Sequence, residues 1–258
     1  MRIDVLTLFP EQFRGFAETS IVRIAREKRL LDLRFHDLRD YTTDRHRTVD
    51  DRPFGGGPGM VLKVEPYVLA VEDIVAAGTY ERAASSPPVP HDATAPASDA
   101  ERLTEAPPTL ILLTPQGRKL DQPLLEKLAS EPWLVVLCGH YEGFDERIPE
   151  ILEPLEVSIG DYVLSGGEVA APVLIDGVTR LIPGVLGHPK SAEEDSFSGG
   201  EEGLLDYPQY TRPREFRGRR VPDELLTGDH VRVAAWRAEQ ARERTRQRRS
   251  GSEENSGS

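Results

Sequence analysis

The sequence contains almost no cysteine and no long apolar run. Its only cysteine is Cys138, which excludes an internal disulfide framework and a cysteine zinc site. This residue lies in the run WLVVLC, which indicates a buried thiol in the core. No apolar stretch approaches the ~18 residues of a membrane span, and the N-terminal MRIDVLTLFP is typical of a strand and not of a signal peptide. We therefore expect a cytoplasmic protein with no membrane partner.

The common nucleotide-binding loops are also missing from residues 158–168, which read SIGDYVLSGGE and join an expected strand to an expected helix. This segment has neither the G-x-G-x-x-G spacing of a dinucleotide fingerprint nor the Gly-Lys-Ser/Thr ending of a P-loop. Its three glycines have no Cβ, so backbone amides and carbonyls can approach a ligand closely. We interpret it as a loop that holds a nucleotide-like ligand in an unusual way.

Positive charge is scarce overall but concentrated near the C-terminus. The formal net charge is −12, yet residues 212–249 contain twelve arginines and six acids and carry +6, which leaves −18 for the rest. Such a local arginine field can bind RNA, although a solvated helix laced with ion pairs fits the last helix equally well. A second basic cluster, DRHRTVDDRPFGGGPG, begins at Asp44 and runs into a glycine-rich loop.

Strands and helices are expected to alternate in the first part of the chain. Continuous apolar runs such as LILL and WLVVL are typical of strands buried on both faces of a parallel sheet. The predicted class is therefore α/β with a mainly parallel sheet. The expected strands are 3–8, 31–35, 109–113, 133–138 and 155–159, and the expected helices are 10–28, 66–77 and 122–129.

Composition divides the chain into domains and connecting segments. Residues 83–108 are rich in Ala, Pro, Ser and Thr and are expected to form a disordered surface insertion in the first domain, residues 1–187. Residues 188–203 are acidic and glycine-rich and are expected to be a flexible linker. Residues 204–249 form an arginine-rich domain before a disordered tail, 250–258. Its last helix should span 229–249, with Asp229 or Thr227 as N-cap and one apolar side made of Val231, Ala234, Ala235 and Ala238.

Several long motifs occur in a fixed order along residues 1 to about 240, with the insertion left out. They are LFPEQF, DRHRTVDDRPFGGGPGM, TPQGRKLDQ, CGHYEGFDERI, SIGDYVLSGGE, IPGVLGHP, EDSF and GLLDYPQYTRP. The chain thereby resembles the bacterial tRNA (guanine-N1)-methyltransferase family. The resemblance implies a SPOUT-like fold with a deep trefoil knot and a small α-helical C-terminal domain. It also implies methyl transfer from S-adenosylmethionine to N1 of guanosine 37, 3′ of the anticodon in tRNA.

The reaction that the resemblance implies has clear chemical needs. Guanine N1 carries a proton at neutral pH, so a base must remove it, and the negative charge that develops on O6 needs a cation or donor. The sulfonium donor is already electrophilic and needs positioning more than activation. The resemblance implies that Asp195, in EDSF, is the base and that Arg180 stabilises O6. Without it, Asp195 would be interpreted as a solvated linker acid and Arg180 as an arginine facing a helix dipole.

The resemblance also assigns residues to binding. Three loops at strand ends are expected to form the cofactor pocket, with Glu142 on the methionine ammonium or a ribose hydroxyl and His140 as a contact residue. RNA contacts are expected from the glycine-rich loop and from the arginine-rich end, where Tyr207 and Tyr210 offer base stacking. The expected RNA-binding residues are Asp50, Gly57, Gly59, Ser191, Arg217, Arg219 and Arg220. The expected cofactor-binding residues are Leu113, Thr114, Pro115, Gly139, Tyr141, Glu142, Gly143, Ser158, Ile159, Gly160, Asp161, Tyr162, Val163, Leu164, Gly166 and Gly167.

Further expectations follow from the resemblance. The family is a homodimer whose active sites use both chains, and it requires Mg²⁺, for which this sequence shows no recognisable ligand set. Two alternatives to the enzyme are a non-catalytic RNA-binding protein and a nucleotide hydrolase. The hydrolase is the weakest because no Gly-Lys-Ser/Thr is present. The RNA-binding protein is weakened because the base, the arginine and all three pocket loops occur together.

Overall fold

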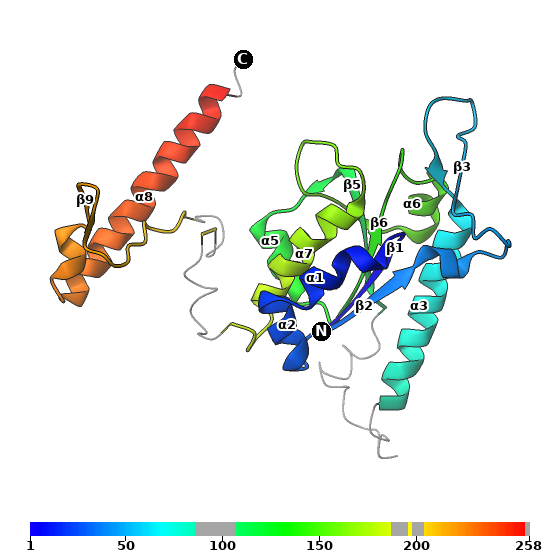
Figure 1. Cartoon of the computed structure of the whole chain (residues 1–258), viewed down its shortest axis with the longest axis horizontal. Helices are drawn as coiled ribbons and strands as arrows, with labels where there is room; N and C mark the ends of the chain where they lie inside the picture. Colours follow the sequence, from blue (N-terminus) through cyan, green and yellow to red (C-terminus); the bar gives the residue numbers. More distant parts are fainter. Residues whose placement is uncertain (86–106, 187–195, 198–203, 256–258) are drawn as a thin grey trace, which may run out of the picture. The chain divides into compact units, whose positions relative to one another are not determined.

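A parallel sheet lies at the centre of the first part of the chain (Figure 1). In the computed structural model, which describes residues 1–85, 107–186, 196–197 and 204–255, this sheet has five strands in the order β2-β1-β6-β5-β7. Each neighbouring pair is parallel, which confirms the expected α/β class. The strands are β1 (Arg2–Thr7), β2 (Asp32–Asp37), β5 (Thr109–Lys119), β6 (Trp133–Cys138) and β7 (Leu155–Ser158).

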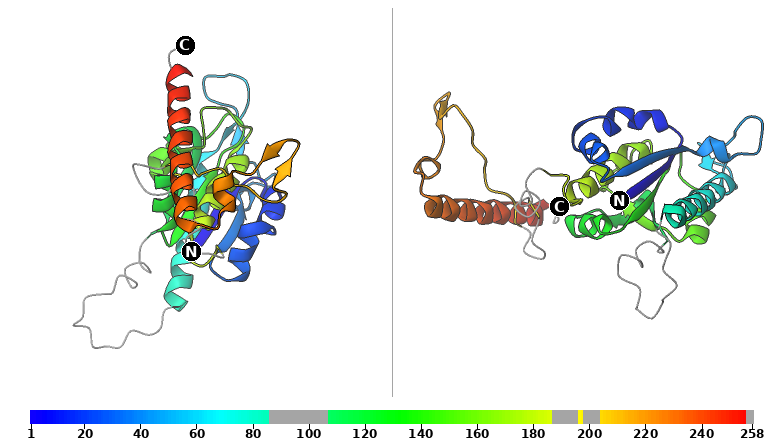
Figure 2. Two further views of the ribbon diagram at one scale, coloured as in Figure 1. Left: turned by 90° about the vertical axis from the view of Figure 1, so that its left-hand side faces the viewer. Right: turned by 90° about the horizontal axis from the view of Figure 1, so that it is seen from below.

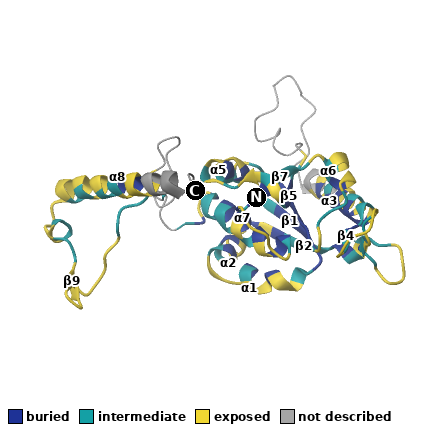
Figure 3. Ribbon diagram, turned by 90° about the horizontal axis from the view of Figure 1, so that it is seen from above, coloured by how far each residue is buried: buried dark blue, intermediate teal, exposed yellow. Residues whose placement is uncertain are grey.

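Helices cover both faces of this sheet (Figures 1 and 2). Side chains alternate across β6, so Leu134, Val136 and Cys138 enter one core and Trp133 and Val135 enter the other. This explains why the run WLVVLC is apolar throughout, since every residue of β6 is buried. Figure 3 shows buried residues in dark blue along the neighbouring strand β1. The first core packs against α1 (Arg14–Ala17), α2 (Ser20–Glu27), α5 (Gln122–Ala129) and α7 (Gly167–Leu181), and the second against α3 (Val64–Ser85) and α6 (Arg147–Leu152).

One predicted helix is wrong in its continuity. Residues 10–28 form a 3₁₀ turn, η1 (Pro10–Phe13), followed by the separate helices α1 and α2. The break comes after Ala17, where the Thr19 hydroxyl donates to the Gly15 carbonyl (2.7 Å) and Ser20 has a φ of +49°. The side-chain hydrogen bond of Thr19 offers the backbone an alternative to a continuous helix.

Two other elements run further than predicted. Helix α3 continues to Ser85, past the point where the insertion was expected to begin, and residues 86–106 lie outside the described residues. Strand β5 continues from Leu113 to Lys119 because Arg118 and Lys119 pair again with β7 after a register shift. The register shift is a local irregularity that an apolar pattern does not reveal.

A carboxylate is buried at the start of the sheet. Asp4 is fully buried and accepts hydrogen bonds from Arg2 Nε (2.6 Å) and Trp133 Nε1 (2.7 Å), and its other oxygen lies 2.7 Å from His36 Nε2. Burial by itself raises the pKa of Asp4, but the hydrogen bonds from His36, Arg2 and Trp133 outweigh it and hold the pKa below its ordinary value.

The glycine-rich loop projects from a short two-stranded sheet, β3 (Asp50–Asp51) and β4 (Val61–Leu62). Backbone hydrogen bonds fasten this sheet to the loop after β6, from the Leu62 amide to the Gly143 carbonyl (3.0 Å) and from the Asp145 amide to the Leu62 carbonyl (3.0 Å). The loop is thereby anchored at its base, while Phe54 at its tip is fully exposed.

The second unit spans Gly187–Ser258, beyond the first unit at Met1–Leu186. Its described elements are β8 (Glu215–Phe216), β9 (Arg219–Arg220), the 3₁₀ turn η5 (Asp223–Leu226) and α8 (His230–Asn255). The expected helical unit therefore also contains a short two-stranded sheet. In the expected linker, the structure describes Ser196 and Phe197, whose amide donates to the Leu204 carbonyl (2.9 Å).

Asp229 is the N-cap of α8, as one of the two predictions had it, because its carboxylate accepts from the amides of Val231 (3.0 Å) and Arg232 (3.2 Å). The helix runs to Asn255, so the prediction of a disordered tail is wrong for residues 250–255.

The predicted apolar side of α8 is also wrong. Val231 is 81% exposed, and Ala234, Ala235 and Ala238 are exposed as well. The helix instead turns Val233, Trp236, Gln240, Ala241 and Thr245 inward, because Trp236 is the largest apolar side chain on it and contacts Tyr210. Across the described ranges, no helix is both long and apolar enough to cross a membrane.

Candidate functional site

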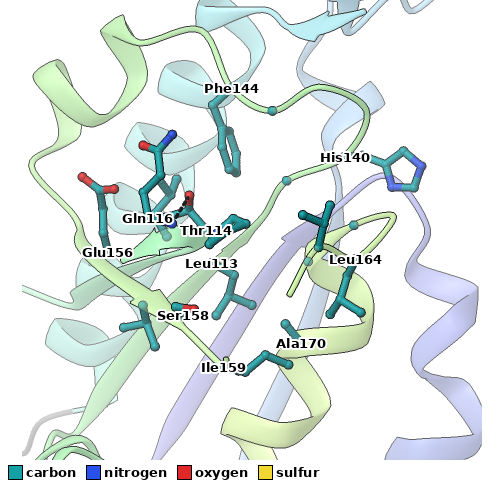
Figure 4. Close-up of a pocket in the computed structure, with 18 of the residues that line it drawn as sticks. Leu113, Thr114, Gln116, His140, Phe144, Glu156, Ser158, Ile159, Leu164 and Ala170 are labelled. Atoms are coloured by element: carbon teal, nitrogen blue, oxygen red, sulfur yellow. Dashed lines mark hydrogen bonds between the residues drawn. The ribbon is translucent and has the colours of Figure 1, made fainter. Parts of the chain in front are cut away.

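A pocket of about 370 Å³ opens at the carboxyl ends of β6 and β7 and at the middle of β5, where β5 stops pairing with β6 and its register with β7 shifts. Parallel strands that end at one edge of a sheet bring their following loops together, and ligands of α/β proteins commonly bind there. Figure 4 shows the pocket walls, with Leu113 and Thr114 from the middle of β5, His140 and Phe144 from the loop after β6, and Ile159 after β7. The helix α7 begins beside this pocket and contributes Ala170.

The loops after β6 and β7 are fastened to each other through their backbones. The Gly167 amide donates to the Gly139 carbonyl (2.7 Å), and His140 and Gly166 form an isolated β-bridge. A Cβ at Gly167 would lie only 2.8 Å from the Cα of Cys138, so this approach requires glycine. The glycines of SIGDYVLSGGE therefore serve packing as well as ligand access.

The start of the same segment is held by Ser158. Its hydroxyl accepts from the Gly160 amide (3.2 Å) and donates to the Gly160 carbonyl (3.1 Å), and the Tyr162 amide donates to the same carbonyl (3.0 Å). The loop is thus shaped by its own hydrogen bonds before any ligand enters. Such preorganisation reduces the entropy that ligand binding must overcome.

Glu168 was missed at the level of sequence and holds three elements together. Its side chain is buried (4% exposed), accepts from the Thr7 hydroxyl at the end of β1 (2.8 Å), and lies 3.3 Å from His140 Nδ1. An acid in the first turn of a helix, directly after two glycines, was the available indication, since carboxylates are favoured at helix N-termini. The contact with Glu168 fits His140 as an oriented contact residue.

Two buried groups beneath the pocket, Cys138 and Tyr67, have raised pKa values. Burial, together with the nearby Glu168 charge, raises the pKa of the Cys138 thiol well above its ordinary value. Burial and the charges of Cys138 and Glu168 likewise raise the pKa of Tyr67, whose hydroxyl donates to the Cys138 carbonyl. The Cys138 thiol is therefore buried and protonated, which makes it a poor nucleophile.

The structure brings together all but one of the residues expected to bind the cofactor. Asp161 is the exception, since it does not line the pocket and instead forms an exposed ion pair with Lys119 (2.9 Å). Glu142 lines the pocket, and its amide donates to the Met60 carbonyl (3.0 Å), so it links the pocket to the glycine-rich loop. Further lining residues that the motifs did not single out are Phe144, Glu146, Pro149, Glu156, Ser165 and Ala170.

The two residues expected to be catalytic are not brought to this pocket within one chain. Arg180 is near the C-terminal end of α7, about 20 Å along the helix from Gly167 at about 1.5 Å per residue. Asp195 lies outside the described residues. The pocket of a single chain therefore holds the binding loops without the arginine.

The residues expected to contact RNA lie on exposed segments. Gly57 and Gly59 have φ values of +130° and +81°, and Asp50 begins the two-stranded sheet at the base of their loop. Arg217, Arg219 and Arg220 are exposed on the β8–β9 hairpin, and Ser191 lies outside the described residues. Within the described part of the chain, no cluster of three or more His, Cys, Asp or Glu could hold a metal ion. The described residues therefore do not fit the Mg²⁺ site implied by the resemblance.

Comparison with known proteins decides the family. A family profile described as "tRNA (Guanine-1)-methyltransferase TrmD" matches residues 1–88 and 91–253. The chain belongs to this family. The resemblance predicted from the motifs is confirmed, and with it the prediction that the protein is an enzyme, a methyltransferase.

Curated relatives from distant bacteria are similar along almost the whole chain, and each carries the name tRNA (guanine-N(1)-)-methyltransferase. The protein of Moorella thermoacetica is 51% identical over 249 residues, which cover 96% of this chain and 88% of the relative. That of Rhodopirellula baltica is 51% identical over 250 residues, covering 96% and 92%. That of Brevibacillus brevis is 49% identical over 249 residues, covering 96% and 90%.

Proposed function

We propose that this enzyme transfers a methyl group from S-adenosylmethionine to N1 of guanosine 37, 3′ of the anticodon in tRNA. One observation carries the proposal: in a chain of this family, the middle of β5 and the loops after β6 and β7 line a single preorganised pocket. Its volume of about 370 Å³ is in the range of small-molecule sites. The name shared by the relatives, tRNA (guanine-N(1)-)-methyltransferase, supports the substrate class.

The pocket residues have defined tasks in this proposal. S-adenosylmethionine, when bound, supplies an electrophilic methyl group on a sulfonium. Backbone groups of Ile159, Tyr162 and Leu164, in the segment shaped by Ser158, hydrogen-bond the adenine edge. The Glu142 carboxylate binds the methionine ammonium or a ribose hydroxyl through a charge-assisted hydrogen bond. These contacts orient the donor, and their contribution to the reaction is this positioning alone.

Proton removal and charge stabilisation are assigned to two further side chains. Asp195 takes the proton from guanine N1, and Arg180 stabilises the negative charge that then develops on O6.

We further propose that the active form is a homodimer in which each site uses both chains. Arg180 is a helix length away from the pocket of its own chain, so a second copy is needed to complete the site. An exposed apolar surface beside the pocket supports this arrangement, since Val163 is 86% exposed and Tyr162, Val169 and Val173 are about half exposed. A knot of the SPOUT class at the crowded loops and a cytoplasmic location, where tRNA is found, complete the proposal.

Methyl transfer to an unmodified tRNA transcript tests the reaction. We expect transfer to wild-type tRNA and none to a transcript with guanosine 37 replaced by adenosine. Asp195→Ala and Arg180→Ala should each bind S-adenosylmethionine normally in calorimetry and lower single-turnover rates by about 10²–10⁴-fold. Tight tRNA binding without any transfer would instead support the non-catalytic RNA-binding protein.

Mixing two variants tests the shared site. Ser165 lines the pocket on an exposed loop, so Ser165→Trp should block S-adenosylmethionine binding while leaving the fold intact. If Asp195 serves the pocket of the other chain, an equal mixture of Ser165→Trp and Asp195→Ala chains should recover about a quarter of wild-type activity, because half the dimers are mixed and each has one intact site. No recovery after subunit exchange would refute the sharing.

A further inference from the structure

The second unit contains a pocket of its own, of about 430 Å³. One wall is the chain segment from Tyr207 to Arg214 and the other is α8, which are visible together in Figure 1. The segment is tied to the helix and to the strand region that follows it. The Leu205 amide donates to the Thr245 hydroxyl (2.9 Å), and the Val221 amide donates to the Arg214 carbonyl (2.9 Å). The pocket is therefore formed before a ligand binds.

The lining combines flat aromatic and apolar surface with positive charge. Tyr207 and Tyr210 contribute rings, and Val221, Leu225 and Val233 contribute apolar surface. Three arginines also line the pocket, namely Arg212, Arg214 and Arg237. The described lining contains no Asp or Glu. A ligand that matches this lining has a planar, partly apolar ring and a negative charge.

The aromatic and cationic groups lie against one another. The Arg237 guanidinium lies 4.6 Å from the centroid of the Tyr207 ring, and the rings of Tyr210 and Trp236 are 6.3 Å apart. Tyr210 is about half exposed, so its ring can take another partner. Tyrosine rings and guanidinium planes are the surfaces on which unstacked bases of RNA stack.

The pocket arginines differ from several others in the same unit. Arg220, Arg232 and Arg246 lie within 4.0 Å of the carboxylates of Glu215, Glu224 and Glu243, respectively. In contrast, no carboxylate of the described residues lies within this distance of the pocket arginines Arg212, Arg214 and Arg237. Their charge is available to an anion such as a phosphate.

We infer that this pocket binds one nucleotide of the tRNA, with the base stacked against Tyr207 or Tyr210 and the phosphate paired with the arginines that line the pocket, Arg237 included. The inference rests on the proposed function, because it takes tRNA as the substrate. A free mononucleotide has the same ring and phosphate as one nucleotide of the tRNA and is the other possible occupant of the pocket. The strong positive charge of residues 212–249 favours the polyanion, since electrostatic attraction grows with the number of phosphates neutralised.

Two pairs of matched variants test the inference. Tyr207→Leu removes the ring, whereas Tyr207→Phe keeps it. Arg237→Gln removes a charge from the pocket, whereas Arg242→Gln removes a charge from an exposed position of the same helix that does not line the pocket. The measurements are the Kd for unmodified tRNA by fluorescence anisotropy at several salt concentrations, the Kd for S-adenosylmethionine by calorimetry, and helical content by circular dichroism.

Tyr207→Leu and Arg237→Gln are expected to weaken tRNA binding by about tenfold, and Arg237→Gln should also lower the salt slope of binding by about one. Tyr207→Phe and Arg242→Gln should stay within about twofold of wild type. The Kd for S-adenosylmethionine should be the same in all five proteins. Unchanged tRNA affinity in folded Tyr207→Leu and Arg237→Gln would overturn the inference.

Guanosine monophosphate separates the two sources of a nucleotide. If it binds the wild-type chain and loses this binding in Tyr207→Leu while tRNA affinity does not change, the pocket serves a free nucleotide and the inference is overturned. Failure of the proposed function has a different result. A wild-type chain that transfers no methyl group would refute the proposed reaction, and the comparison of tRNA affinities would still decide what the pocket binds.

Discussion

Replacing Gly117 with alanine tests how closely β5 and β7 approach each other beneath the cofactor pocket. Gly117 lies where the register of the two strands shifts, between Leu113 and Arg118. An added Cβ would lie 2.4 Å from the backbone nitrogen of Val157 and 2.5 Å from the carbonyl carbon of Glu156. Both are backbone atoms, which cannot rotate away as the end of a flexible side chain can, so the strands must separate.

The expected cost follows from this geometry. Overpacking costs about 1–3 kcal/mol, and separating the strands removes one or two backbone hydrogen bonds worth about 1 kcal/mol each. Together these predict a loss of about 2–5 kcal/mol in the free energy of unfolding of the first unit, and of about 5–20 °C in its melting temperature. Affinity for S-adenosylmethionine should fall as well, because Thr114, Pro115 and Gln116 precede Gly117 and line the pocket.

Gly15→Ala is the matched control. Gly15 lies in α1, and no described heavy atom is within 4 Å of an added Cβ there, so stability should stay constant or rise by up to about 1 kcal/mol. Both variants should be made in a Trp236→Phe background. The remaining tryptophan, Trp133, is buried in β6, so its fluorescence during urea unfolding reports on the first unit alone. A Gly117→Ala protein within about 0.5 kcal/mol of its parent would refute the close approach of the strands.

Three further predictions concern buried groups of the first unit. Glu168→Ala should lower the free energy of unfolding by about 1.5–3 kcal/mol, because it leaves the Thr7 hydroxyl without its acceptor. Glu168→Gln keeps an acceptor oxygen and should lower it less. Equal losses of the two variants in urea unfolding would contradict this. Because the folded pKa of Asp4 is depressed, the stability it contributes is present above the unfolded-state pKa of about 4 and is lost as the pH falls below this value through the lower folded pKa. Urea unfolding of Asp4→Asn from pH 7 down to about pH 2 should therefore show a weaker dependence on acid than wild type, and an equal dependence would exclude Asp4 as its source. Burial and a raised pKa predict that Cys138 resists iodoacetamide at pH 8 in the folded protein and reacts in urea, as mass spectrometry can determine; rapid labelling of the folded chain would show that β6 opens.

Much of the pocket that we propose for the cofactor was predictable because its parts are contiguous in sequence. Segments such as SIGDYVLSGGE combine strand end, glycine turn and helix start, and parallel strands necessarily bring such loops to one edge of the sheet. Asp161 shows the limit of this reasoning, since it lies within the segment but pairs with Lys119 outside the pocket. Membership of a motif does not determine the direction in which a side chain points.

Other features depended on contacts between distant segments and had no local pattern. The ends of β1, the loop after β6 and the start of α7 meet at Glu168, which no spacing rule connects. The face that α8 buries is determined by Trp236 packing on Tyr210, and not by the alanines that an apolar count favours. The pocket of the second unit likewise joins Tyr207 to Arg237 across thirty residues.

Residue order alone therefore settled the α/β class, most strand positions, the membership of the family and most of the segments that line the first pocket. These properties depend on apolar periodicity and on contiguous motifs, which operate over a few residues. Only the tertiary structure decided the strand order, the bracing role of Glu168, the separation of Arg180 from the pocket of its own chain, and the aromatic and arginine pocket beside α8. Each of these depends on which residues meet across long sequence separations, and local chemistry does not specify such meetings.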